Sequence, residues 1–269
     1  MEPVVLHIWP ADDSVTLTLC NPEPTSERRP VVIVIPGGAY IAQAQGEAEP
    51  VAERFAQMGY LGCVLRQSTL YKDFQHTDGE PNPHCRFPEP LQQLAAAIKL
   101  LRAKADSYAL DPERVILMGF SAGGHLAANY ANLWADPEVL SAGNWTSDEI
   151  RPNALVLCYA ATELGVTRHS SMLRAVFGTE NVPQDKIDRY NPKNTVKAGI
   201  TPPVFLWHTA DDPSVSVWSS YHMAQALQEK GVVCETHIFS SGPHASATAD
   251  GLPAYRWPEL ADDFLKAVL

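Results

Sequence analysis

Ser121 lies within residues 119–123, which read GFSAG and fit the pattern G-x-S-x-G. The apolar segment RVILM precedes the pattern, and AGGHLAANYANLW, which reads as a helix, follows it. This context predicts a tight strand-to-helix turn that holds the serine hydroxyl above a helix N-terminus, where it can act as a nucleophile. A phosphate-binding glycine turn is the alternative. It requires a P-loop lysine or a fuller glycine fingerprint, and the sequence has neither.

A serine hydroxyl is a poor nucleophile at neutral pH until an imidazole removes its proton. Among nine histidines, His244 lies in SSGPHASA, between the last predicted strand, 232–239, and the last predicted helix, 257–269. A site of this kind places its base in that loop, so we expect His244 to be the base. We expect structural roles for three others, namely His125, His208 and His237.

Two adjacent carboxylates, Asp211 and Asp212, follow the predicted strand 203–208 in the stretch FLWHTADDPSVSV. A carboxylate at this place would hold the imidazole in one tautomer and stabilise it when it becomes cationic. The other aspartate would then be an ordinary turn former. Spacing alone does not choose between the two.

An ester or amide carbonyl under attack develops negative charge on its oxygen, and backbone N–H groups can stabilise that charge. We expect one such group from Ala122, directly after the serine. We expect others from Gly38 and Ala39, in the loop IPGGAY (35–40) after an early strand. Tyr40 is expected to line the pocket and contact the substrate. An ordinary glycine turn is the alternative interpretation of this loop.

Apolar segments that read as buried strands alternate with helical segments along most of the chain, which predicts an α/β fold with a mostly parallel central sheet and helices on both faces. The expected strands are 31–35, 61–66, 114–118, 154–160, 203–208 and 232–239. The expected helices are 47–58, 89–105, 122–134, 219–231 and 257–269. Residues 4–8 and 15–19 alternate in polarity and predict an antiparallel hairpin at a sheet edge.

We expect residues 1–269 to form a single domain. Residues 161–202 contain no clear strand pattern. We interpret them as a small cap insertion over the carboxyl edge of the sheet, which is where ligands bind in such folds.

From about residue 30 onward, five blocks of sequence resemble serine esterases of the α/β-hydrolase superfamily, in the same order. The blocks are VVIVIPGGAY, EAEPVAERFAQMGYLGCVLR, DPERVILMGFSAGGHLAA, PVFLWHTADDPSVSV and SSGPHAS. The chain is similar above all to bacterial acetyl/feruloyl carbohydrate esterases and to hormone-sensitive-lipase-like esterases.

The resemblance implies that Ser121 is the nucleophile and His244 the base. In these relatives the acid lies four residues after the histidine of WHT and three before a valine. Here that position is Asp212, between His208 and Val215, with Asp211 as the second choice. The implied reaction is hydrolysis of a short acyl ester on a sugar or oligosaccharide, without a metal or organic cofactor.

The sequence departs from the relatives at five positions in loops that shape the substrate pocket. None of them removes a group that the resemblance assigns to catalysis, so the departures affect the expected substrate and not the expected reaction. The residues that stand at these positions are Pro36, Ala39, Gln67, Ser216 and Ala245.

The net charge of −11 results from 31 acidic and 20 basic residues. An acidic surface repels polyanions, so we expect no nucleic-acid partner. The sequence has no apolar stretch of membrane-spanning length and no signal-peptide pattern at its start. The five cysteines include no CxxC pair and read as reduced thiols. These features favour a cytoplasmic protein and leave the formation of a homo-oligomer open.

Residues 67–87 read as a polar, proline-rich surface loop. Four potential metal ligands crowd within it, but their spacing matches no zinc pattern. We therefore expect no metal, and we expect the loop to contribute to the rim of the substrate pocket. The four ligands are His76, Asp78, His84 and Cys85.

Two other functions remain to be tested against the esterase interpretation. A peptidase of the prolyl-oligopeptidase type would share these sequence blocks, although such enzymes usually carry an additional propeller domain that 269 residues cannot hold. A binding protein on a hydrolase scaffold would need no reactive serine, and the intact serine, histidine and aspartate argue against it.

Overall fold

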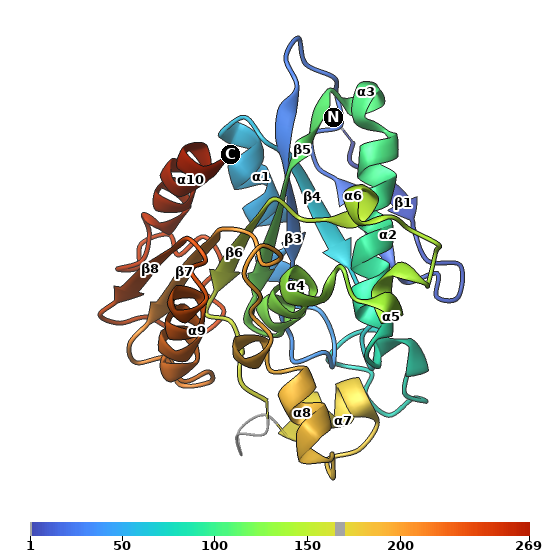
Figure 1. Cartoon of the computed structure of the whole chain (residues 1–269), viewed down its shortest axis with the longest axis vertical. Helices are drawn as coiled ribbons and strands as arrows, with labels where there is room; N and C mark the ends of the chain where they lie inside the picture. Colours follow the sequence, from blue (N-terminus) through green and yellow to red (C-terminus); the bar gives the residue numbers. More distant parts are fainter. Residues whose placement is uncertain (1, 165–169) are drawn as a thin grey trace.

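The computed structural model describes residues 2–164 and 170–269 and contains an eight-stranded sheet in the order β1-β2-β4-β3-β5-β6-β7-β8 (Figure 1). The strands β1 and β2 form an antiparallel hairpin, β2 pairs antiparallel with β4, and all other pairs are parallel. The predicted α/β fold and the predicted edge hairpin are therefore confirmed. The strands are β1 Val4–His7, β2 Thr16–Leu19, β3 Arg29–Ile35, β4 Leu61–Arg66, β5 Leu110–Phe120, β6 Ala154–Cys158, β7 Val204–Thr209 and β8 Cys234–Phe239.

Helices cover both faces of the sheet. The apolar side chains of α1 and α10 pack on one face, and those of α2, α4 and α9 pack on the other. The helices are α1 Glu49–Gln57, α2 Glu89–Ala103, α3 Ala105–Tyr108, α4 Ser121–Leu133, α5 Pro137–Leu140, α6 Ser147–Ile150, α7 Ser170–Phe177, α8 Gln184–Arg189, α9 Trp218–Glu229 and α10 Trp257–Val268. Short 3-10 helices are η1 Gln45–Glu47, η2 Pro83–Cys85 and η4 Pro192–Asn194.

The strand β3 shows why its sequence is continuously apolar. Residues 31–35 are completely buried, and their side chains alternate between the two hydrophobic clusters on opposite faces of the sheet. A strand covered by helices on both faces has no solvent side and therefore no polar alternation. The strand β5 begins earlier than its apolar pattern, because Leu110 pairs with Arg29 beyond a shift in register.

The carboxyl ends of the parallel strands meet at one edge of the sheet, and the predicted site residues follow these ends. Ser121 comes directly after β5, Asp212 lies after β7, and His244 lies after β8. The helices α7 and α8 lie near this edge (Figure 1). They belong to the stretch 161–202, in which the described residues form no strand. Part of the expected cap, 165–169, lies outside the described residues, and the division into one domain with a cap stays a prediction.

Gly123 allows the first turn of α4 to approach β3 closely. A Cβ atom at this position would lie 2.1 Å from the carbonyl oxygen of Ile35 and 2.4 Å from that of Pro36. Both neighbours are backbone atoms, which cannot move aside as a flexible side chain can. The glycine therefore fixes how near the turn at Ser121 lies to the loop after β3.

We expect Gly123→Ala to lower the free energy of unfolding by about 3 kcal/mol, measured by urea denaturation, because the new methyl group overlaps backbone atoms. Helix propensity alone would change stability in the opposite direction, by about 1 kcal/mol. Gly79→Ala is the control, since a Cβ atom there meets nothing within 4 Å. A Gly123→Ala variant as stable as the control would contradict this account of the packing.

Candidate active site

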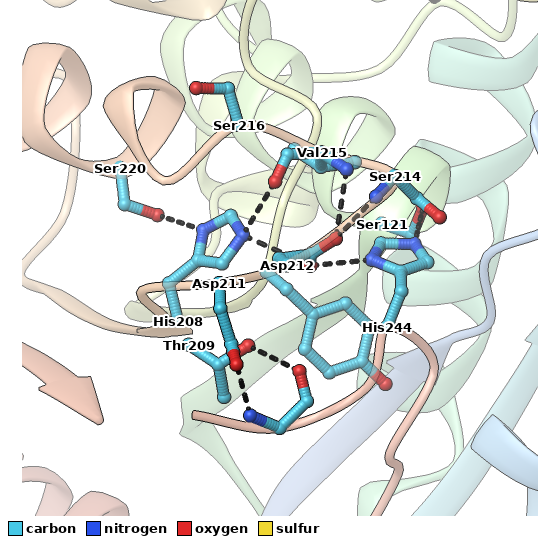
Figure 2. Close-up of polar contacts among 12 residues, drawn as sticks. Ser121, His208, Thr209, Asp211, Asp212, Ser214, Val215, Ser216, Ser220 and His244 are labelled. Atoms are coloured by element: carbon cyan, nitrogen blue, oxygen red, sulfur yellow. Dashed lines mark hydrogen bonds and ion pairs between the residues drawn. The ribbon is translucent and has the colours of Figure 1, made fainter. Parts of the chain in front are cut away.

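Ser121 forms the turn that its sequence pattern predicts. It is the first residue of α4 and has a φ of 49°, in the left-handed region that residues other than glycine rarely adopt. Such strain persists only where surrounding structure enforces it, and it is concentrated at functional sites. The turn directs the side chain toward His244, whose Nε2 lies 2.9 Å from the Ser121 Oγ (Figure 2).

His244 connects the serine to a carboxylate. Its Nδ1 lies 2.7 Å from Oδ2 of Asp212, on the opposite side of the ring from Ser121. Because a carboxylate only accepts hydrogen bonds, we assign the ring proton to Nδ1. The Nε2 atom can then accept the hydroxyl proton of Ser121. The three side chains form a continuous hydrogen-bonded chain from Asp212 to the serine.

Asp212 is held as a buried anion. Its side chain is 1% exposed, and its Oδ1 accepts hydrogen bonds from the amides of Ser214, at 2.8 Å, and Val215, at 2.9 Å. Burial alone would raise the pKa of this carboxyl. The hydrogen bonds from His208, His244 and the Val215 amide outweigh the burial, so the pKa lies well below its usual value. Asp212 therefore remains charged beside the imidazole.

His208 is a second imidazole on the same carboxylate, a contact that the sequence did not predict. It is fully buried, and its Nε2 lies 3.1 Å from Oδ2 of Asp212 and 3.2 Å from the carbonyl oxygen of Val215. Its Nδ1 lies 2.8 Å from the hydroxyl of Ser220. Since the carbonyl oxygen can only accept, we assign the proton to Nε2, which donates to the loop that carries Asp212. The spacing of four residues between His208 and Asp212 was the sequence feature that could have predicted this contact.

Asp211 has a different role from its neighbour. It is exposed, and its Oδ1 accepts a hydrogen bond of 2.8 Å from the amide of Gly242, two residues before His244. The hydroxyl of Thr209 donates to the carbonyl oxygen of Gly242 at 3.0 Å (Figure 2). Of the two aspartates that spacing could not separate, the structure thus brings Asp212 to the imidazole, and Asp211 contacts the backbone of the loop that carries it.

The loop after β3 contributes two residues to the pocket at the serine. Gly38 has a φ of 112°, and a Cβ atom there would lie 1.9 Å from the carbonyl oxygen of Ala42, so only glycine fits. Gly38 and Ala39 line the same pocket as Ser121. The amide of Ala122 lies in the first turn of α4, where amides lack partners within the helix. Within the described part of the chain, these three amides donate to no other residue.

Tyr40 does not contact this pocket, so the predicted substrate-binding role is wrong. Its ring is 1% exposed and packs edge-to-face against Phe87 and His125. Its hydroxyl lies 2.9 Å from Nδ1 of His125, whose Nε2 faces the carbonyl oxygen of Tyr190. The left-handed conformation of Tyr40, with a φ of 58°, turns the side chain into the core. His125 has the structural role that the sequence indicated.

A pocket of about 350 Å³ opens at Ser121 and His244. Most of its other lining side chains are small or apolar. Two of the larger ones come from segments that the sequence placed at the site, namely the loop 67–87 and the expected cap, whereas the segment of Glu47 gave no such indication. Phe74 belongs to the loop after β4, Met172 belongs to α7, and Glu47 ends η1. The remaining lining residues are Gly38, Ala39, Ala44, Ala161, Ser171, Ser214, Val215 and Ala245.

The potential metal ligands of the loop 67–87 do not converge. His76 pairs with Asp73, His84 pairs with Glu89, and the thiol of Cys85 donates to backbone carbonyl groups. Among residues 2–164 and 170–269, no group of three or more histidine, cysteine or acidic side chains could hold a metal ion. No helix in the same residues is long and apolar enough to cross a bilayer.

The lowered pKa of Asp212 predicts how its contribution to stability depends on pH. The contribution is complete above the unfolded-state pKa, near 3.9, and is lost as the pH falls through the lower folded-state pKa. We expect the stability of the wild type relative to Asp212→Asn to decrease as the pH falls from about 5 to about 3, measured by urea unfolding. The same comparison with Asp78→Asn, an exposed carboxylate, is the control. A constant difference over this range would refute the prediction.

Comparison with known proteins finds a solved structure with the same fold and two relatives in sequence, whose names refer to an ester hydrolase, a xylanase and an esterase. An acetyl ester-xyloside bifunctional hydrolase from Caldicellulosiruptor lactoaceticus superimposes with a TM-score of 0.81 at 29% identity, covering 98% of this chain and 96% of its own. The endo-1,4-beta-xylanase B of Butyrivibrio fibrisolvens is 29% identical over 83% of this chain. The acetylxylan esterase of Xylanibacter ruminicola is 27% identical over 87% of this chain.

The chain spans only 33% of the length of the Butyrivibrio protein and 44% of the Xylanibacter protein. The structural likeness, in contrast, extends over nearly the whole of both chains. The resemblance to α/β-hydrolase esterases that the five sequence blocks indicated is confirmed. The BD-FAE family matches residues 17–227, which include Ser121 and Asp212 and end before His244. Because this match covers well over half of the sequence, the chain belongs to the BD-FAE family.

Proposed function

We propose that the protein is a serine carboxylic-ester hydrolase that removes short acyl groups, acetyl in particular, from sugars or oligosaccharides. The observation that carries the proposal is the hydrogen-bonded chain of Asp212, His244 and Ser121 at the edge of a pocket. This arrangement of acid, base and hydroxyl activates serine for attack on a carbonyl carbon.

In the proposed reaction, the Oγ of Ser121 attacks the ester carbonyl carbon while His244 Nε2 takes the hydroxyl proton. The negative charge on the carbonyl oxygen is stabilised by the amides of Gly38, Ala39 and Ala122. His244 then gives its proton to the leaving alcohol, which departs and leaves an acyl-enzyme. Water attacks the acyl group with His244 as base, and the proton returns to Ser121 as the acid product leaves. Asp212 stabilises the imidazolium at each stage.

The size of the pocket supports a short acyl group. Its volume of about 350 Å³ is near the lower end of the range for ligand pockets and must also admit part of the alcohol. Met172 and Phe74 line the pocket with apolar side chains. Residues of α7 thus border the reaction centre, which supports our proposal that 161–202 acts as a cap on a single domain.

Two hollows beside the pocket support a polar alcohol. The smaller hollow, of about 420 Å³, shares Ser171 with the catalytic pocket. The larger hollow, of about 600 Å³, shares Leu70 and Tyr71 with the smaller hollow. Charged and amide side chains line the larger hollow, among them Arg66 and Lys72. Such groups can bind the hydroxyls of a sugar, and a tyrosine ring can stack on a sugar ring.

The names of the similar proteins also favour this substrate, since two of them refer to acetyl esters and to xylan or a xyloside. All five cysteines are free, which suits a reducing compartment. We therefore propose that the protein acts in the cytoplasm on imported oligosaccharide fragments.

We expect p-nitrophenyl acetate and acetylated xylo-oligosaccharides to be hydrolysed, and octanoate esters to be poor substrates. Ser121→Ala should lower kcat by at least about 10³-fold, since the nucleophile is lost. Asp212→Asn should lower kcat by about 10³- to 10⁴-fold, because the imidazole adopts the wrong tautomer. Asp211→Asn is the matched control and should cost less than about tenfold, since Asp211 does not contact the imidazole.

Other outcomes would point to other functions. Turnover of aminoacyl-arylamides without turnover of acetyl esters would favour a peptidase. No turnover at all, together with no labelling of Ser121 by a fluorophosphonate probe, would favour a binding protein. Activity that survives in Ser121→Ala would contradict the proposed nucleophile.

The two hollows proposed to bind the alcohol can be tested at Tyr71, which lines both of them. Tyr71→Ala should lower kcat/KM for acetylated xylo-oligosaccharides by about three- to tenfold, because one aromatic contact contributes about 0.5–1.5 kcal/mol. It should leave kcat/KM for p-nitrophenyl acetate unchanged, since that ester has no sugar. Tyr255→Ala is the control, because Tyr255 is exposed and lines none of the three hollows. An equal loss on both substrates would exclude a sugar contact at Tyr71.

A further inference from the structure

Glu47 is a carboxylate inside the catalytic pocket that the proposed reaction does not use. It is 1% exposed, and both of its oxygens accept hydrogen bonds. Oε2 accepts the amide N–H of Gly37 at 2.8 Å, and Oε1 accepts the hydroxyl of Tyr159 at 2.8 Å. Carboxylates are rarely this buried unless they are paired, and the two hydrogen bonds provide the pairing. What these two contacts do for the site remains to be explained.

The two partners of Glu47 connect it to different loops of the site. Gly37 directly precedes Gly38 and Ala39, which line the pocket. The hydroxyl of Tyr159 accepts a hydrogen bond of 3.0 Å from the amide of Ala247, three residues after His244. The Tyr159 ring also packs edge-to-face on the His244 ring, with centroids 4.9 Å apart. Hydrogen bonds thus run from one carboxylate to both catalytic loops.

The carboxylate also lies beside the nucleophile. A Cβ atom on Gly37 would be 2.8 Å from Oε2 of Glu47 and 2.8 Å from Cβ of Ser121. No side chain therefore fits between the carboxylate and the serine. A small displacement of Glu47 would be transmitted directly to the loop after β3.

The loop after β3 and the loop that carries His244 both contain alanines in a strained backbone conformation, which contacts from outside these loops must stabilise. Ala39 has a φ of 56°, Ala245 a φ of 58° and Ala247 a φ of 49°. Alanine pays about 1–2 kcal/mol for the left-handed conformation, and such residues persist only where surrounding contacts enforce it. The hydrogen bonds from Glu47 and Tyr159 are contacts of this kind.

The protonation states of Glu47 and Tyr159 fit the hydrogen bonds that connect the two loops. Burial raises the pKa of Glu47, opposed by the hydrogen bonds of Tyr159 and Gly37 and by attraction to His244. Burial, together with the nearby Glu47 carboxylate, raises the pKa of Tyr159 well above its usual value. Tyr159 therefore keeps its proton, and its hydroxyl donates to Glu47 while it accepts from Ala247.

We propose that Glu47 is a positioning residue for the ester hydrolysis proposed above. It orients the amides of Gly38 and Ala39 through Gly37, and it orients the loop that carries His244 through Tyr159. The inference rests on the proposed function. It adds a connection between the amides that stabilise the negatively charged carbonyl oxygen and the loop that carries the base, His244.

A carboxylate suits this role better than an amide. The site presents two donors to residue 47, the N–H of Gly37 and the O–H of Tyr159. A glutamine has one acceptor oxygen and donates through its nitrogen, so one of the two donors would lose its partner. A buried donor without a partner is unfavourable, and the loop that carries it would shift.

The first test is Glu47→Gln on p-nitrophenyl acetate. We expect kcat to fall by about 10²-fold, because displacing an oxyanion donor costs about 10²- to 10³-fold, and KM to stay within about twofold. Glu49→Gln is the matched control. Glu49 begins the next helix and pairs with Arg66 outside the catalytic pocket, so kcat should change less than about twofold. The thermal midpoint is measured for each variant.

The second test is Tyr159→Phe, alone and combined with Glu47→Gln. The single variant should lower kcat by about tenfold, and the double variant should be no worse than Glu47→Gln, because both substitutions break one connection. Tyr159→Phe also tests the proposal if Glu47→Gln does not fold.

The outcomes separate this inference from the proposed function. Wild-type esterase activity that is lost in Ser121→Ala but kept in Glu47→Gln would overturn only the role of Glu47. Additive losses in the double variant, or a rise in KM together with a lower thermal midpoint and an unchanged kcat, would also overturn it. A wild type without esterase activity would overturn both proposals.

Discussion

The parallel pairing of β3, β5, β6, β7 and β8 at their carboxyl ends is the constraint on which the candidate site depends. Ile35 lies opposite Gly119, Phe120 opposite Cys158, and Thr209 opposite Phe239, so the strands end at nearly the same level. Each loop that leaves this edge starts from a fixed position. Side chains that are 123 positions apart in the sequence can therefore meet within hydrogen-bonding distance.

Two buried carboxylates at this edge have opposite electrostatic behaviour. Asp212 accepts hydrogen bonds from two backbone amides and faces two imidazoles, which together outweigh the cost of burial and lower its pKa. Glu47 accepts from one amide and one phenol, and its pKa is raised. The number and charge of the donors decide the sign. The same chemical group can thus stay anionic beside the base in one place and connect two loops in another.

Continuous apolar strands and helical spacing predicted most of the fold, because these patterns record burial directly. Ser121 and His244 could be found from their places relative to strands and helices. Spacing relative to the strands did not choose between the adjacent aspartates, and only the resemblance to known esterases pointed to Asp212. The prediction for Tyr40 failed because a left-handed backbone turned its ring inward. Glu47 gave no signal, since its burial depends on Tyr159, 112 positions away in the chain.

Two apolar walls of the pocket belong to parts of the chain that carry none of its reacting groups. Ser121 directly follows β5, and Asp212 and His244 lie on loops after β7 and β8, whereas Met172 belongs to α7 and Phe74 to the loop after β4. Insertions or substitutions in these two surface segments can alter the shape of the pocket while the sheet keeps the reacting groups in place. Evolution can therefore diversify selectivity without rebuilding the chemistry, and exchange of the two segments between homologues offers an engineering route to new ester preferences.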